Sequence, residues 1–193
     1  MDSRMELTDG AFVAKARAGD ADAFRLLVER HSRRLFGLAF RMTGNEQDAE
    51  DVVQESFLRA YRRLSQFDDR ASFGTWLYRI AANCSIDLMR TKGQKAQQMV
   101  ETDVEDPVLA LRSSDPSPER SALSAEVRDR VAEAMHELSP VERSAFVLRH
   151  FEGMRLEEVG RALGCQTNAA KHSVFRAVQK LRRALEPLAS PSK

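Results

Sequence analysis

Apolar residues recur along most of the chain at the three- and four-residue spacing that an amphipathic α-helix requires. Sustained apolar/polar alternation, which would indicate β-strands, is missing. The clearest helical stripe follows Asp20 and consists of Phe24, Leu27, Val28, His31, Leu35, Leu38, Ala39 and Met42. A second stripe follows Asn45 and consists of Ala49, Val52, Val53, Phe57, Ala60, Tyr61 and Leu64. The pattern predicts an all-α protein.

Residues that begin and end helices occur at regular intervals in the first half of the chain. Gly19 and Gly44 interrupt the apolar pattern, and Asn45 followed by Asp48 is typical of an N-cap with an acid in the first turn. The sequence therefore predicts four helices, over about residues 8–18, 20–44, 45–64 and 73–90, with a loop at 65–71.

The periodicity fails between residues 93 and 121, where Pro107, Pro116 and Pro118 occur among serine and acidic residues. A segment of roughly thirty residues without secondary structure is long for one compact domain. We therefore expect two small helical domains, at 1–92 and 122–187, joined by a flexible acidic linker at 93–121 and followed by a short tail at 188–193.

The second domain ends in a pattern typical of a helix-turn-helix. A short amphipathic stretch stops at Gly164, a residue suited to the left-handed conformation at a helix end. Residues 167–183 then contain five basic residues and no acidic one. In helical projection the basic residues lie opposite an apolar arc of Ala170, Val174, Ala177, Val178, Leu181 and Leu185.

The basic side of this last helix is a candidate for DNA contact, because the N-terminal residues of the second helix in such a motif reach base edges in the major groove. A charged helix that merely faces solvent is the alternative, but the absence of acidic residues favours DNA. Phe175 lies near the polar side, where it either contacts a thymine methyl or closes the edge of the domain. The candidate contacts are Asn168, Ala169, Lys171, His172 and Arg176.

Composition limits the classes of function. The chain has 193 residues and a net charge of only +1, so local basic patches have to attract any nucleic acid. Cys84 and Cys165 lie far apart without ligand-like neighbours, so we expect neither a disulfide nor a metal site. No segment is apolar enough for a secretion signal or a membrane helix, which favours a cytoplasmic protein. Phosphate-binding loops and catalytic motifs are absent, so we expect no enzyme, no cofactor and no small-molecule substrate.

The stretch predicted as the third helix begins acidic and finishes basic. Residues 46–55 hold five acids and no base, whereas Arg59, Arg62 and Arg63 follow. Acids favour the N-terminus of a helix and bases its C-terminus, so the helix dipole alone explains this order. The alternative to this dipole explanation is that the acidic and the basic residues of the helix both form functional surfaces.

Aromatic residues favour the second explanation. Six of the chain's 13 aromatic residues lie between residues 57 and 78, interleaved with arginines. Rings beside cations suit the stacking of an unpaired base. Phe57 and Tyr61 are expected in the core, whereas Phe67 follows a helix in a polar loop and has no obvious core to fill.

Four segments, in this order, resemble bacterial sigma factors of the extracytoplasmic-function (ECF) group in the sigma-70 family. They are Asp48-Ala-Glu-Asp-Val-Val-Gln-Glu-Ser-Phe57, Phe73-Gly-Thr-Trp-Leu-Tyr-Arg-Ile-Ala-Ala-Asn83, Leu138-Ser-Pro-Val-Glu-Arg143 and the helix-turn-helix. The resemblance covers roughly residues 8–92 and 122–185. It implies an alternative sigma factor that binds core RNA polymerase, melts the −10 promoter element with its first domain and reads the −35 element with its second.

The resemblance also implies roles for individual residues. An acidic face of the third helix would dock on core polymerase through Asp48, Asp51, Gln54 and Glu55. The loop 67–72 would form a pocket for a base flipped out of the −10 element, and the fourth helix would line the adjacent DNA. Trp76 and Tyr78 fit the core equally well. The −10 candidates are Arg62, Phe67, Asp69, Arg70, Ser72, Trp76, Arg79 and Asn83.

Two further features concern the linker and the recognition helix. The linker acids would occupy polymerase channels that otherwise hold nucleic acid, or would simply solvate a tether; they are Glu101, Asp103, Glu105 and Asp106. Many members have Gly-Thr-Val-Lys-Ser-Arg at the start of the recognition helix, whereas this chain has Asn168-Ala-Ala-Lys-His-Ser173. The role of the helix is expected to hold, but its −35 sequence preference is expected to differ.

The partners that the resemblance implies are core RNA polymerase, promoter DNA and an anti-sigma factor, which would hold the chain near the membrane. The residues by themselves leave two other functions open. One is a stand-alone helix-turn-helix regulator whose N-terminal helices bind a ligand or dimerise, which predicts a palindromic site with half-sites about one helical turn apart. The other is an RNA-binding antiterminator. A sigma factor, in contrast, requires polymerase for promoter-specific activity.

Overall fold

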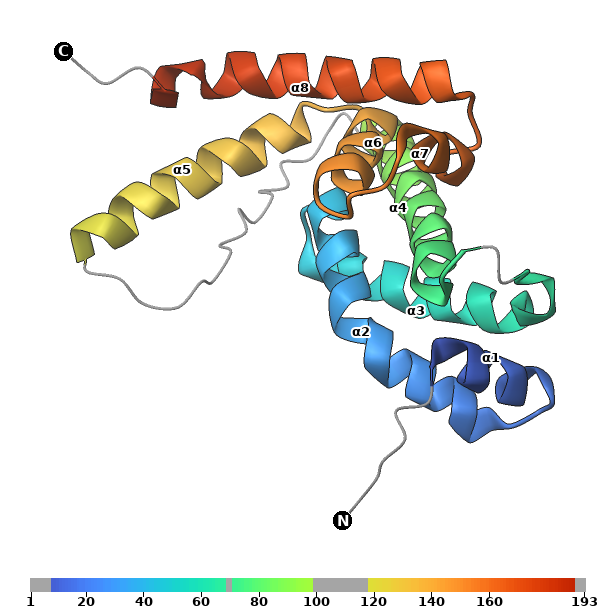
Figure 1. The fold of residues 1–193 in the computed structure, drawn as a ribbon. Helices are drawn as coiled ribbons and strands as arrows, with labels where there is room; N and C mark the ends of the chain where they lie inside the picture. The colour runs from blue at the N-terminus through green and yellow to red at the C-terminus, as the bar shows by residue number, and fades with distance from the viewer. Residues whose placement is uncertain (1–7, 69–70, 99–117, 190–193) are drawn as a thin grey trace. The chain divides into compact units, whose positions relative to one another are not determined.

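Helices make up the whole regular structure of the described residues, which in the computed structural model are 8–68, 71–98 and 118–189 (Figure 1). No strand occurs within these ranges, in agreement with the predicted all-α class. The elements are α1 (Asp9–Arg17), α2 (Ala21–Thr43), α3 (Glu46–Arg62), the 3₁₀ turn η1 (Leu64–Gln66), α4 (Phe73–Gln98), α5 (Pro118–His136), α6 (Pro140–His150), α7 (Leu156–Ala162) and α8 (Thr167–Ala189).

Side-chain caps explain where the first helices begin and end. The Asp20 carboxylate accepts a hydrogen bond from the backbone N–H of Ala23 at 3.0 Å, at the start of α2. Gly44, at a φ of +75°, ends α2, and the Asn45 side chain then accepts from the N–H of Asp48 at 3.0 Å to begin α3. These are the predicted boundaries.

Helices α4 and α5 extend into both ends of the segment predicted as a linker. Helix α4 continues to Gln98, well beyond residue 90, because no proline interrupts it and Gly93 alone is too weak a signal to end a helix. Helix α5 begins at Pro118, a residue well suited to the first turn. Residues 93–98 and 118–121, both assigned to the linker, are therefore helical. The acidic positions Glu101, Asp103, Glu105 and Asp106 lie outside the described residues.

The chain forms two compact units, Met1–Ser85 and Ile86–Lys193, and the division falls within α4. In the first unit, α1, α2, α3 and the beginning of α4 contribute the core, whose largest fully buried side chains are Phe73, Leu27, Leu35, Leu38, Met42, Leu77 and Val13. Most positions of the two predicted apolar stripes are buried there.

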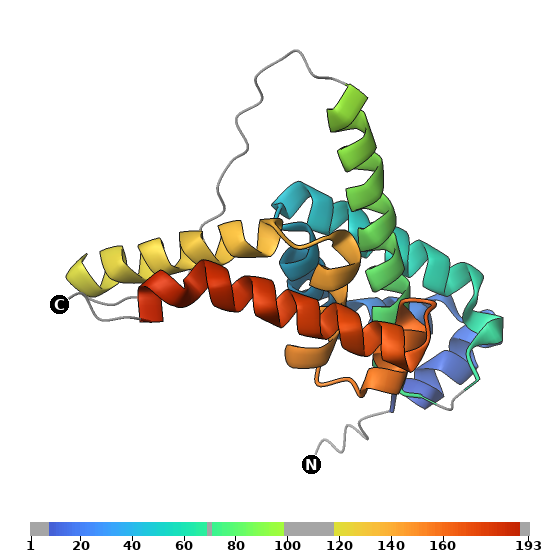
Figure 2. The ribbon, with the colours of Figure 1, turned by 90° about the horizontal axis from the view of Figure 1, so that it is seen from above.

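In the second unit, α5, α6 and α7 pack against α8, and α5 lies alongside it (Figure 2). A buried cluster here consists of Ala134 of α5, Leu138 just after α5, and Ala177 and Leu181 of α8, with Met135, Phe146, Ala184 and Leu185 packed around them. Ala170 is also buried, whereas Val174 and Val178 are half-buried. The predicted apolar arc of the last helix therefore forms its packed side.

The turn between α7 and α8 depends on two glycines. Gly164, at a φ of +65°, adopts the left-handed conformation that the sequence predicted. Gly160 lies inside α7, where its carbonyl accepts from the N–H of Cys165 at 2.9 Å. A Cβ atom at position 160 would lie 2.9 Å from the carbonyl oxygen of Cys165, which belongs to the backbone and cannot rotate away.

We expect Gly160→Ala to destabilise the second unit by about 1–3 kcal/mol, because the added methyl group forces α7 and the turn apart. Gly93→Ala is the matched control, since nothing lies within 4 Å of a Cβ there and alanine is the better helix former by about 0.5–1 kcal/mol. Urea unfolding followed by circular dichroism measures both. Equal stability of Gly160→Ala and the parent would contradict the tight turn.

Candidate nucleic-acid interface

The N-terminal part of α8 presents four of the five predicted DNA contacts on the surface. Asn168, Ala169, Lys171 and His172 are all exposed, whereas Ala170 between them is buried against the rest of the unit. Helix α7 and the turn at Gly164 hold this end of α8, so the helix-turn-helix prediction is confirmed. Phe175, one turn further along, is 59% exposed and adds an apolar side chain to the same surface.

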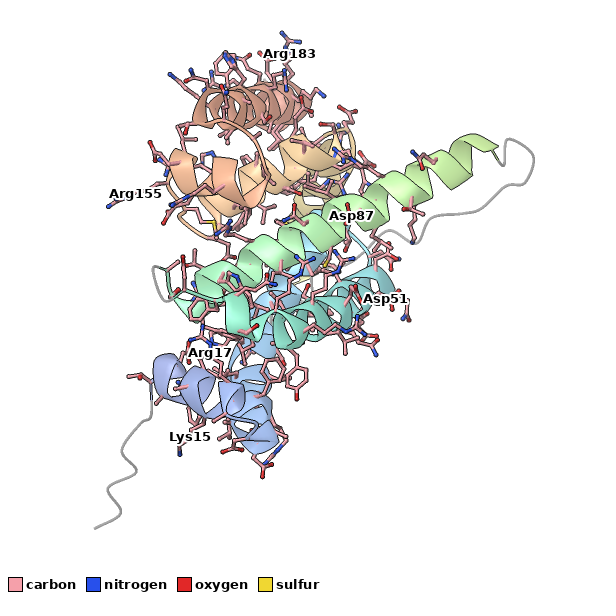
Figure 3. The ribbon with its side chains drawn as sticks, turned by 90° about the vertical axis from the view of Figure 1, so that its right-hand side faces the viewer. Lys15, Arg17, Asp51, Asp87, Arg155 and Arg183 are labelled. Carbon is pink, nitrogen blue, oxygen red and sulfur yellow. The ribbon has the colours of Figure 1, made fainter. Side chains whose placement is uncertain are left out.

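Two of the five cations on α8, one of them the candidate DNA contact Arg176, form ion pairs within the protein. The Arg176 Nε donates to Glu142 Oε1 at 3.0 Å, and the Lys180 Nζ donates to Glu142 Oε2 at 2.8 Å. Lys171, Arg182 and Arg183 are exposed, and Arg183 projects away from α8 (Figure 3). The basic surface of α8 is therefore smaller than its sequence indicates.

Glu142 is a functional candidate that sequence reasoning missed. It lies in the first turn of α6, where its N–H donates to the Ser139 Oγ at 3.3 Å and its Oε2 accepts from the Ser139 N–H at 3.1 Å. This reciprocal capping box has a sequence signature, serine followed three residues later by glutamate, which could have revealed it. The tertiary contact with α8 has no such signature.

The Glu142 carboxyl is ionised at neutral pH despite its burial. Burial alone would raise its pKa, but hydrogen bonds from Lys180 and Ser139, together with the charge of Lys180, outweigh burial and place the pKa below the ordinary value of 4.5. Burial lowers the pKa of the neighbouring Arg143 to about 10, so this guanidinium is also charged at neutral pH.

In the first unit, an aromatic cluster follows α3. Phe67 packs against Phe73 and Trp76 with ring centroids 6.0 and 5.3 Å apart, and Phe73 also meets the edge of His31. Phe67 is only 5% exposed, so the expectation that it has no core to fill is wrong. The Phe67 ring is therefore part of the core of the first unit and not an exposed side chain of an open loop.

Arg17 explains why Phe67 is buried. From the end of α1, its Nε donates to the Leu64 carbonyl at 2.9 Å, its Nη2 donates to the Phe67 carbonyl, and its guanidinium lies 5.7 Å from the Phe67 ring centroid. Figure 3 shows Arg17 on α1. Because this contact joins residues 47 and 50 positions apart, local sequence patterns do not reveal it.

An open cavity of about 490 Å³ lies beside this cluster, a volume typical of small-ligand sites. Asp9 is held at its rim by Arg30 at 2.9 Å and His31 at 2.8 Å. Two −10 candidates of the predicted pocket, Asp69 and Arg70, lie outside the described residues. The residues that line the cavity are Thr8, Asp9, Gly10, Arg30, Phe67, Ala71, Ser72 and Phe73.

The remaining candidates on α4 share one face of the helix, because Ser72, Trp76, Arg79 and Asn83 are three or four residues apart. The Ser72 Oγ accepts from the Thr75 N–H at 3.1 Å and so caps α4. Trp76 and Arg79 are half-buried, and Asn83 is exposed. Tyr78 is buried, which decides between its two predicted roles in favour of the core.

The predicted acidic face of α3 is only partly exposed. Asp51 (labelled in Figure 3) and Gln54 are exposed, and Glu55 pairs with Arg59 at 2.6 Å. Asp48 is buried, because it lies one helical turn before the buried Val52 and on the same side. It therefore does not belong to the exposed face, contrary to the prediction.

Tyr61 corrects a second expectation about α3. Phe57 is buried as predicted, but Tyr61 is 54% exposed and packs edge-to-face with Phe24 of α2, with ring centroids 4.9 Å apart. Leu58 is also exposed, so α3 carries apolar side chains beside its acidic ones. Arg62, a −10 candidate, is exposed at the end of the same helix.

Known proteins share this arrangement of two helical regions. Two family models match the chain, Sigma-70 region 2 over residues 27–95 and Sigma-70, region 4 over residues 128–181. The ECF RNA polymerase sigma-E factor of Haemophilus influenzae is 34% identical over 187 residues, which cover 95% of this chain and 98% of that protein. The chain belongs to the ECF sigma factors of the sigma-70 family. It is thus an alternative sigma factor, a transcription initiation factor that directs RNA polymerase to promoters.

Solved structures place the sigma factor in the same fold. CnrH, in complex with the cytosolic domain of CnrY, matches with a TM-score of 0.63 and 28% identity over 93% of this chain and 97% of that one. The sigma factor RpoE of Bartonella quintana, in complex with the anti-sigma factor NepR, matches with a TM-score of 0.66 and 21% identity over 84% of this chain and 96% of that one.

No helix within the described residues of the sigma factor has the length and apolarity to span a bilayer. No three His, Cys, Asp or Glu side chains in the same ranges are grouped so that they could hold a metal ion.

We expect Glu142→Gln to lower the free energy of unfolding by about 1–2 kcal/mol at neutral pH, since two charge-assisted hydrogen bonds are lost but both cations remain partly solvated. The pKa of Glu142 is lower in the folded protein, so its contribution is present above the ordinary value of 4.5 and is lost as the pH falls through the folded pKa. Urea unfolding from about pH 7 to about pH 3 should show the parent and the variant converging. A constant difference would contradict an ionised Glu142.

Proposed function

We propose that this sigma factor docks on core RNA polymerase through α3, captures a base of the −10 element at the cavity beside Phe67, and reads the −35 element with α8. The observation that carries the proposal is the exposed, acid-free N-terminal surface of α8 behind the turn at Gly164. A helix-turn-helix held in this way is built to enter a major groove.

Sequence readout at the −35 element falls to the first turns of α8. Asn168 and His172 offer hydrogen-bonding groups to base edges, and exposed Phe175 offers an apolar surface to a thymine methyl. Lys171, Arg182 and Arg183 are the cations available to the phosphates. Ala169 is small and exposed, so it allows close approach of the helix to the groove.

Opening of the −10 element requires a site for an unstacked base, because flipping a base costs a few kcal/mol that stacking and hydrogen bonding must offset. The cavity of about 490 Å³ has the size for a base, aromatic walls at Phe67 and Phe73, and polar groups at Asp9, Arg30 and Ser72. Phe67 acts from a packed position, as a fixed wall of the cavity. The face of α4 that carries Trp76, Arg79 and Asn83 continues from Ser72, and Arg62, Asp69 and Arg70 remain further candidates.

Docking on core polymerase uses both charge and apolar area on α3. Exposed Asp51 and Gln54, with Glu55, set orientation and association rate, as rim charges do. Exposed Leu58 and Tyr61 supply the apolar area that an interface core requires.

An anti-sigma factor is proposed as the regulator of this chain. The fold is shared with RpoE of Bartonella quintana, which was solved with the anti-sigma factor NepR, and with CnrH, which was solved with the cytosolic domain of CnrY. A partner with a membrane anchor would hold the chain near the membrane, while the proposed function itself belongs in the cytoplasm with RNA polymerase.

Run-off transcription with purified core polymerase tests the function directly. Added to core enzyme, the chain is expected to produce transcripts from one start site on a promoter template selected from a randomised library. Core enzyme alone is the control and should produce none. Specific duplex binding by an isolated dimer, with no effect on polymerase, would overturn the proposal in favour of a stand-alone regulator.

Asn83→Ala tests the −10 surface without disturbing the core, since Asn83 is exposed. We expect the open-complex fraction to fall about fivefold, as for one lost hydrogen bond of about 1 kcal/mol, while binding to core polymerase is unchanged. Permanganate reactivity of thymines at the −10 element measures opening. Thr91→Ala, an exposed polar residue on the same helix but about 80° away around its axis, is the control and should behave as the parent. Parental reactivity of Asn83→Ala would exclude this face of α4.

A further inference from the structure

Glu142 links α6 to the recognition helix through both of its carboxylate oxygens. Oε1 accepts from Arg176 and Oε2 from Lys180, residues 34 and 38 positions later in the chain. The Glu142 side chain is only 6% exposed, so water does not compete for it. A buried carboxylate with fixed hydrogen bonds from its own helix cap is a rigid anchor for whatever it holds.

The hydrogen bond between Arg176 and Glu142 leaves the two Nη groups of the guanidinium available to contact a base. The hydrogen bond uses Nε, and the Arg176 side chain is 62% exposed. Within the described residues its Nη groups form no other hydrogen bond. A guanidinium has five N–H donors in a planar fork, and the two Nη groups form the pair that bonds O6 and N7 of guanine. Fixing Nε on the protein side therefore orients the fork toward a ligand.

The same carboxylate changes the electrostatics of α8. Its one negative charge is shared between Arg176 and Lys180, so these residues attract phosphates less than free cations would. Attraction to any DNA, whatever its sequence, scales with the number of cations that contact phosphate. The Glu142 carboxylate thus lowers the affinity of α8 for DNA of any sequence while it orients Arg176 for contact with a base.

We propose that Glu142 is a positioning residue for promoter recognition, which aims Arg176 at a base edge of the −35 element and withholds Lys180 from the phosphates. It raises discrimination between sequences and lowers affinity for all of them. The inference rests on the proposed −35 role of α8.

The first experiment compares two lysines of α8. Lys171→Gln and Lys180→Gln remove the same charge from the same helix, and the reconstituted holoenzyme is titrated against promoter DNA over a series of salt concentrations. The slope of log affinity against log salt should fall by about one for Lys171→Gln and stay unchanged for Lys180→Gln. An equal fall in slope for the two variants would show that Lys180 contacts phosphate. It would overturn the proposal that Glu142 withholds Lys180 from the DNA.

The second experiment removes the anchor itself. Glu142→Gln should raise holoenzyme affinity for a promoter with a scrambled −35 element, steepen the salt slope by about one, and lower the ratio of selected to scrambled affinity at least about fivefold. Glu157→Gln, an exposed acid on α7, is the control for the change in net charge and should leave the ratio unchanged.

A purely structural role for Glu142 makes a different prediction, namely loss of affinity for both promoters. The Arg176→Gln background separates the two roles, because a residue that acts through Arg176 has no further effect on the ratio there. A further fall of the ratio in that background would overturn the positioning role. If Arg176→Gln itself leaves the ratio unchanged, Arg176 reads no base and the positioning role fails; if Asn168→Ala and His172→Ala also leave it unchanged, the −35 role of α8 fails. If Arg176→Gln lowers the ratio and Glu142→Gln does not, only the positioning role fails.

Discussion

The division of α8 into a packed side and a reading side is the constraint on which the rest of the second unit depends. Ala177 and Leu181 are buried against α5, and Ala170 is buried near the turn, so rotation of α8 about its axis would expose apolar area and bury charge. The surface that α8 presents is therefore set by its packing. Contacts with DNA can be weak individually, since the helix is already held in the orientation that they require.

Local features of both units could be predicted from the sequence because they depend on neighbouring residues. The caps at Asp20 and Asn45 and the turn at Gly164 each involve groups within a few positions, and the structure has all of them where the pattern indicates. The end of α4 could not be placed, because Gly93 weakens a helix without ending it. Boundaries that rest on weak signals remain uncertain in position even when the helix itself is evident.

Tertiary contacts explain why the sites were predicted less well than the helices. Phe67 looked exposed because its covering groups come from Arg17 of α1 and from Trp76, and the contact of Arg176 with Glu142 has no local signal because Glu142 lies on α6. Asp48 is buried although the resemblance implies a docking role for it, and Tyr61 is exposed although its helical spacing indicates a core position. For Phe67 and Arg176 the decisive contact comes from a segment distant in the sequence, which local patterns do not reveal.

The pairing of cations within the second unit fits a protein that works only on a larger machine. The net charge of the chain is +1, and Glu142 offsets part of the charge of the helix that meets DNA, so the chain alone has little sequence-independent attraction to a duplex. Low general affinity is an advantage when polymerase holds two DNA-contacting regions at once, because the second contact then forms at high effective concentration. Affinity can come from this linkage, which leaves α8 free to discriminate between sequences.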